Sequence, residues 1–160
     1  MMMRLKPMAA VALIAAPAMA QQVTADAYVA TAGASDLYEK TSSQLVLGST
    51  RNAKVRSFAQ GMIRDHNKST AMVKAAAAKA GVAAKPPVLT PEQSDMVAQL
   101  RAQQGTARDQ AYLAQQRTAH EQALALHQGY AANGSAAPLK TTAGQIAPVV
   151  QHHIDMLKGM

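Results

Sequence analysis

Apolar residues recur every three or four positions along four separate stretches of this chain, and this spacing most constrains its fold. The clearest stretch carries Leu139, Ala143, Ile146, Val150, His153 and Leu157. Residues at this spacing lie on one face of an α-helix, which is stable when that face packs against other helices. No strand-like alternation competes with the pattern. The four stretches therefore predict an all-α four-helix bundle.

Capping residues and helix breakers set the expected boundaries. We expect long helices over residues 24–47, 52–80, 106–132 and 137–157, with Asn52 as the N-cap of the second. The proline-rich segment 85–91 cannot be helical, and a short helix is expected to follow it, with Thr90 as N-cap and Pro91 at its first position. Pro148 lies inside the last long helix and is expected to bend it or to leave one backbone carbonyl without its partner. Only 3% of the residues are aromatic, which also argues against a β-rich fold.

Residues 1–20 have the layout of a secretory signal peptide. A basic start precedes an apolar stretch over residues 8–16, and an Ala-Met-Ala exit ends at Ala20. Cleavage near Ala20 would leave residues 21–160 as one periplasmic or secreted domain; the alternative is a buried N-terminal helix. The apolar stretch is shorter than the ~20 residues that a membrane-spanning helix needs. No transmembrane segment is expected in the mature chain.

Each predicted long helix carries a metal-competent residue on its inward side. These residues are Glu39, His66, His120 and His153. The first three lie within about one turn of their helix centres, whereas His153 lies about five residues past the middle of its helix. Helix midpoints meet at one level in an antiparallel bundle, so the four side chains are expected to converge. A carboxylate with imidazoles suits one transition-metal ion, such as iron, zinc, copper or manganese.

Three more polar residues are expected near this site. Asp65 is one position round the helix from His66 and is placed to orient a histidine of a neighbouring helix. Asp109 and Tyr112 lie on the third long helix, although the helix dipole alone favours an acid at Asp109.

The remaining histidines, His127 and His152, are expected at the boundary or the surface. A metal-free core is the alternative interpretation, with Glu39 tied to His66 or to tyrosine hydroxyls in a structural network.

Several kinds of chemistry are excluded by what the sequence lacks. Without cysteine there is no disulfide, no thiolate metal site and no covalent haem attachment. The Glu-x-x-His pairs of di-iron bundles are absent, as are the motifs of serine hydrolases, phosphate-binding loops and zinc proteases. If the chain is an enzyme, a metal-dependent oxidoreductase is the class that remains.

Basic residues crowd the second long helix and the linker after it. Residues 51–85 contain eight lysines or arginines against one acid, Asp65. This side is either a solvated outer face or a contact with an anionic envelope surface, for which Arg64, Lys68 and Lys74 are the candidates. Export and the scarcity of aromatic residues argue against nucleic acid as a partner.

Four strings in this sequence are similar to those of a known family. They are FAQGMIRDH at 58–66, DQAY at 109–112, HEQAL at 120–124 and PVVQHH at 148–153. Together they resemble a family of small exported bacterial proteins that is catalogued as a domain of unknown function and grouped with the ferritin-like superfamily. The resemblance extends from about residue 26 to residue 156.

The resemblance implies a ferritin-like helical bundle, in which the family's polar positions fall on Glu39, Asp65, His66, Asp109, His120 and His153. Arg108 and His127 depart from the pattern, because the family more usually has an aromatic residue there. The family has no established activity, so the resemblance bears on fold more than on function.

Two hypotheses follow. In the first, an exported bundle binds a metal ion through Glu39 and the three histidines and acts in metal handling or in the response to oxidants. In the second, a non-enzymatic envelope protein has a structural polar core, and its basic face binds an anionic partner.

Overall fold

The computed structural model describes residues 23–160, and within this range the chain forms five α-helices and no β-strand. They are α1 (Ala25–Leu47), α2 (Ala53–Lys79), α3 (Pro91–Arg101), α4 (Gly105–Asn133) and α5 (Ala137–Lys158). The expected all-α fold is confirmed. The signal peptide predicted over residues 1–20 lies outside the described residues. In the part of the chain that is described, no helix is both long and apolar enough to cross a membrane.

The helices begin where side chains can satisfy free backbone N–H groups. Thr24 accepts a hydrogen bond from the backbone of Ala27, and Asn52 accepts from the first turn of α2. At α3, Thr90 and Gln93 cap each other reciprocally. Such caps supply partners that the first turn of a helix otherwise lacks. The expected N-caps at Asn52 and Thr90 are thus confirmed.

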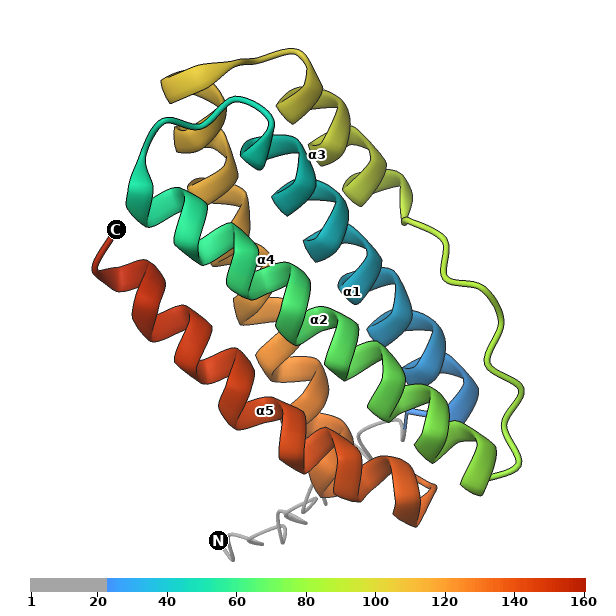
Figure 1. The fold of residues 1–160 in the computed structure, drawn as a ribbon. Coiled ribbons are helices and arrows are strands. Elements are labelled where there is room, and N and C mark those ends of the chain that lie inside the picture. The colour runs from blue at the N-terminus through green and yellow to red at the C-terminus, as the bar shows by residue number, and fades with distance from the viewer. Residues whose placement is uncertain (1–22) are drawn as a thin grey trace, which may run out of the picture.

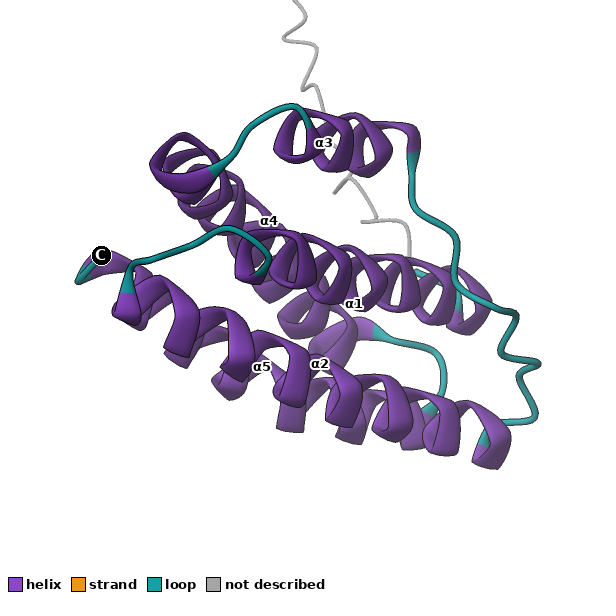
Figure 2. Cartoon of the chain, turned by 45° about the horizontal axis from the view of Figure 1, so that its top comes forward, coloured by secondary structure: helices purple, strands orange, loops and turns teal. Residues whose placement is uncertain are grey.

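The four long helices form a bundle in which each helix has two neighbours (Figure 1). α1 packs against α2 and α4, and α5 packs against the same two helices. The α1–α2 and α4–α5 pairs are joined by short turns and run antiparallel, whereas residues 80–104 form a long crossover from α2 to α4. α3 belongs to this crossover and lies over α1 and α4 (Figure 2). A single long crossover is the connectivity of ferritin-like bundles, with which this arrangement is compatible.

Two apolar clusters fill the two ends of the bundle. One contains Tyr28, Val73 and Ile146, and the other contains Phe58 and Leu157. Along each long helix, buried polar residues lie between the residues of one cluster and those of the other. They are Asp36, Glu39, His66, Gln116, His120 and His153. The core is therefore apolar at both ends and polar at mid-height.

The inward face of α1 differs by one position from the expected one. A spacing of three or four residues from Ala32 to Glu39 passes through Ser35, but Ser35 is half-buried and Asp36 is only 3% exposed. The buried face is wide because α1 contacts α2 on one side and α4 on the other. An additional carboxylate thereby enters the core.

Candidate metal centre

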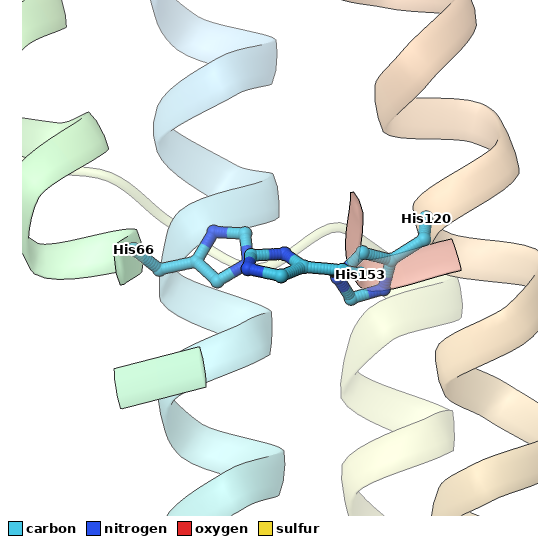
Figure 3. A group of neighbouring side chains, drawn as sticks. All are labelled: His66, His120 and His153. Atoms are coloured by element: carbon cyan, nitrogen blue, oxygen red, sulfur yellow. The ribbon is translucent and has the colours of Figure 1, made fainter. Parts of the chain in front are cut away.

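Three histidines from three helices meet in the polar middle of the bundle. His66 comes from α2, His120 from α4 and His153 from α5, and all three are buried. One ring nitrogen of each lies within 4.8 Å of those of the other two. Figure 3 shows the three side chains pointing toward one another from their separate helices. The helical spacing that puts Met62 and Val150 in the core also directs His66 and His153 inward.

His66 is held by a carboxylate from the neighbouring helix. Its Nδ1 lies 2.8 Å from Oδ1 of Asp36, and Oδ2 of the same carboxylate accepts a hydrogen bond from Thr70. The other ring nitrogen, Nε2, is buried and has no hydrogen-bond partner among the described residues. The orientation of the ring is thus fixed while one nitrogen stays free.

His120 and His153 are held in the same way. The backbone carbonyl of Gln116 accepts from Nδ1 of His120 at 2.9 Å, and Asp65 accepts from Nε2 of His153 at 3.1 Å. Because a carbonyl and a carboxylate can only accept, these ring nitrogens carry the protons. The nitrogens left with lone pairs are Nε2 of His120 and Nδ1 of His153, which lie 3.3 Å apart. Two lone pairs that face each other are stabilised by a cation or a proton between them.

The charge states differ among the three rings. Burial lowers the pKa of His120, and burial together with the charge of His120 lowers the pKa of His153 to about 4. For His66, burial acts in the same direction, but the hydrogen bond with Asp36 and the charges of Glu39 and Asp36 outweigh it and raise the pKa. Near neutral pH, two of the rings are therefore neutral and suited to bind a metal ion directly. At His66 a metal ion competes with the proton more strongly than at the other two rings, because the pKa of this ring is raised.

Glu39 is a buried carboxylate without a hydrogen-bond partner. It is 1% exposed, and neither carboxylate oxygen has a partner among the described residues. Its Oε1 lies 3.7 Å from Nδ1 of His120, but that nitrogen donates to Gln116. Glu39 lies beside the three histidines and is not part of the group within 4.8 Å. Because an unpaired buried carboxylate is costly, this position favours a nearby cation or proton.

The donor set fits a transition-metal ion. Imidazole nitrogens suit zinc, copper and iron. Each ring has its second nitrogen held by a carboxylate or a carbonyl, an arrangement that fixes the tautomer and orientation of histidines that bind metals. Three protein ligands also leave a coordination position for water or a substrate.

Of the three residues expected to support the site, Asp65 alone contacts a histidine of the group. Asp109 accepts a hydrogen bond from Thr50, and Tyr112 pairs with Ser43. Asp109 and Tyr112 precede His120 on α4 by a rise of about 16 Å and about 12 Å. The structure therefore places them toward the end of the bundle and away from the histidines.

Sequence reasoning missed Asp36 and misjudged His127. Asp36 continues the spacing of Tyr28 and Ala32 along α1, which is the signal that could have identified it. The expected boundary position of His127 was wrong: its ring is 3% exposed and its Nδ1 lies 2.9 Å from the hydroxyl of Tyr28. α4 continues to Asn133, so its last turns still pack inside the bundle. His152 is exposed, as expected.

The basic residues of α2 lie outside the core. Arg64, Lys68 and Lys74 are all exposed, and Arg64 pairs with Asp65 at 3.1 Å. A cavity of about 350 Å³ between α2 and α5 is lined by Asp65, Lys68 and Val149, among others. Asp65 has a 28% exposed side chain and links this surface to His153.

Comparison with known proteins places the chain near two groups of unknown function. The model of a family described as a domain of unknown function, DUF4142, matches residues 9–160. No curated protein matches.

Two solved structures share the fold. A DUF305 fragment from Deinococcus radiodurans has a TM-score of 0.72 and 18% identity, over 84% of this chain and 93% of its own. A DUF305 protein from Streptomyces coelicolor, provisionally described as secreted, has a TM-score of 0.66 and 16% identity, over 83% of this chain and 88% of its own. At these identities the likeness concerns the fold alone.

Proposed function

The chain belongs to the family described as a domain of unknown function, DUF4142, and we propose that it is an exported bundle protein that binds one transition-metal ion in its core. The observation that carries this proposal is the convergence of His66, His120 and His153, each with one nitrogen held and the other turned inward. Burying unpartnered ring nitrogens is costly unless a ligand completes them.

The proposed ligands are the three histidines, and Glu39 supplies negative charge beside them. Asp36 and Asp65 are the residues that orient His66 and His153. Zinc, copper or iron fits the donors. The bound ion would act in metal handling or in the response to oxidants, where an open coordination position lets it activate water or dioxygen.

Export is supported by two observations. Residues 1–20 have the layout of a signal peptide. The Streptomyces coelicolor protein of the same fold is provisionally described as secreted. Cleavage near Ala20 followed by release into the periplasm or the medium is the proposed route. N-terminal sequencing of the exported protein tests the cleavage position.

Elemental analysis of the mature protein tests metal binding. The protein is purified without chelators or nickel resin, incubated with zinc, copper or iron, and dialysed. We expect retention of about one ion per chain, and loss of that ion in His66→Ala and His120→Ala.

The chain offers a matched control in two adjacent histidines. His153 is buried and faces the other two rings, whereas His152 is exposed. His153→Ala should lose the ion and His152→Ala should keep it. Equal retention by both variants, or no stoichiometric retention by the parent protein, would contradict the proposal.

A second candidate function rests on the basic residues of α2 and the linker. All eight lysines and arginines between residues 51 and 85 are exposed, and one half-buried acid accompanies them. This surface suits an anionic envelope component. Lys68→Glu with Lys74→Glu should abolish sedimentation with anionic phospholipid vesicles, while the same exchange at Lys140 and Lys158 should leave it unchanged. Binding that both double variants retain would argue against this function.

A further inference from the structure

The four tyrosines of this protein are buried to the same degree. Tyr28, Tyr38, Tyr112 and Tyr130 are each at most 1% exposed. The sequence contains no tryptophan and no cysteine, so tyrosine is the side chain from which an electron is most easily removed. Because exposure does not distinguish the four, their hydrogen-bond partners decide which one is oxidised.

Those partners differ in one chemical respect. The hydroxyl of Tyr38 donates to the amide oxygen of Gln115, that of Tyr112 pairs with the hydroxyl of Ser43, and that of Tyr130 has no partner among the described residues. The hydroxyl of Tyr28 lies 2.9 Å from Nδ1 of His127. Of the four, only Tyr28 faces a group that can accept its proton outright.

The proton lies on the tyrosine in the resting state. Burial lowers the pKa of His127 to about 4, so the ring is neutral near pH 7, and burial raises the pKa of Tyr28. A neutral ring that accepts at Nδ1 gives the buried phenol the partner it needs. With the proton of His127 on Nε2, Tyr28 donates and Nδ1 of His127 accepts.

We propose that Tyr28 is a redox-active residue that gives one electron to an oxidant while its phenolic proton passes to Nδ1 of His127. The O–H bond of Tyr28 breaks and an N–H bond forms on His127. The electron leaves to a one-electron oxidant, such as a transition-metal ion in a higher oxidation state. The products are a neutral phenoxyl radical and an imidazolium ion, and the reverse transfer restores both residues.

The surroundings favour these products. The ring of Tyr130 stacks on that of Tyr28 with a centroid distance of 4.0 Å, which shields the radical from solvent. The negative charge of Asp36 acts on His127 in the direction that favours its protonated form. His127 follows His120 on α4 by a rise of about 10 Å, so an oxidised ion bound by the three histidines would be close enough to accept the electron. The proposal itself does not require that ion.

Light-driven oxidation of the metal-free protein tests the proposal. The mature protein is kept in chelator, oxidised by photogenerated tris(bipyridine)ruthenium(III), frozen, and examined by electron paramagnetic resonance. We expect a tyrosyl radical in the parent protein and its loss in Tyr28→Phe. Tyr112→Phe, which also removes a buried and hydrogen-bonded hydroxyl, should keep the radical. A radical that survives in Tyr28→Phe would overturn the proposal.

His127→Gln separates proton acceptance from hydrogen bonding. The amide oxygen can accept the hydrogen bond, as Gln115 does for Tyr38, but it cannot take the proton. The variant should fold, by circular dichroism, and lose the radical of Tyr28. In the parent protein, radical formation should be slower in deuterium oxide. A full radical yield in His127→Gln, or the absence of an isotope effect, would show that Tyr28 and His127 form a structural pair only.

Discussion

Two polar regions lie at different heights in the same bundle core, and their hydrogen bonds are completed to different extents. In the pair formed by Tyr28 and His127, each group supplies what the other lacks. In the three-histidine group, Asp36, Gln116 and Asp65 hold one nitrogen of each ring, and the inward side is left incomplete. Nε2 of His66 and both carboxylate oxygens of Glu39 have no partner among the described residues.

The Tyr28–His127 pair is closed, because its polar atoms satisfy each other. The three-histidine group is open, because some of its polar atoms have no partner among the described residues. A closed pair contributes a modest net stabilisation, since each hydrogen bond replaces one made to water. An open group destabilises the empty protein and is completed by a ligand from outside. On this basis, removal of a side chain that has a hydrogen-bond partner should destabilise either region, whereas removal of the charge of Glu39, which has no partner among the described residues, should stabilise the metal-free protein.

The largest effect is expected from Asp36→Ala. This change removes the carboxylate that holds a buried histidine of raised pKa, and loss of one member of a buried pair of this kind costs about 3–5 kcal/mol of the free energy of unfolding. Metal affinity should fall by about 10- to 100-fold, because the ring loses the group that orients it. Urea denaturation and metal titration measure the two effects. Asp155→Ala, at an exposed site, is the control and should change neither.

The second largest effect concerns pH. Burial lowers the pKa of His127 from 6.5 to about 4, so between these values the unfolded chain binds the proton more readily than the folded one. The contribution of His127 to the free energy of unfolding is complete above about pH 6.5. It falls by roughly 3 kcal/mol as the pH is lowered toward 4. Denaturation at a series of pH values measures this.

His153 has a similarly lowered pKa and adds to this slope, whereas the raised pKa of His66 acts in a different range: its stabilisation is complete below about pH 6.5 and is lost as the pH rises above that value. A comparison of His127→Gln with the parent protein isolates the contribution of His127. Identical slopes for the two proteins would mean that the Tyr28–His127 pair is open to water.

Glu39→Gln should stabilise the metal-free protein. It removes a buried charge that has no hydrogen-bond partner, and the penalty for such a group is about 1–3 kcal/mol or more. With metal bound, the same change should weaken binding, so its sign reverses between the two states. Thermal denaturation with and without chelator shows the reversal. A loss of stability in both states would mean that Glu39 is already satisfied in the empty core.

The smallest expected change in stability concerns the two stacked tyrosines, Tyr28 and Tyr130. Tyr28→Phe leaves Nδ1 of His127 without its partner and should cost about 1 kcal/mol. Tyr130→Phe removes a hydroxyl that has no partner among the described residues and should cost nothing or stabilise slightly. The stacked rings make each variant the control for the other. Equal losses would mean that the hydrogen bond of Tyr28 contributes nothing.

The fold was largely predictable from the sequence, because the rules that specify helices are local. The apolar spacing along residues 139–157 and the caps at Asn52 and Thr90 act within a few residues. Four helices with one long connection then leave few ways to bury four apolar faces. The inward histidines could be predicted for the same reason, since each lies on an apolar face.

The supporting residues were less predictable, because they depend on how far each helix turns toward its neighbours. The buried face of α1 is wider than its apolar spacing indicates, and it includes Asp36, which reaches His66. Because α4 stays packed in the bundle up to its last turns, His127 is buried against Tyr28. Asp109 and Tyr112 share a face with His120 but lie too far along α4 to reach it. Spacing along one helix specifies a face and not a height.

By itself the sequence determined that this chain forms helices, where they begin, and that His66, His120 and His153 point inward. Those properties follow from backbone geometry and from the period of the α-helix. Only the tertiary structure decided which nitrogen of each ring is held, that Glu39 lies beside the three rings, and that Tyr28 meets His127. Such contacts join residues that are far apart in the chain, and they depend on the rotation and the height of one helix against another.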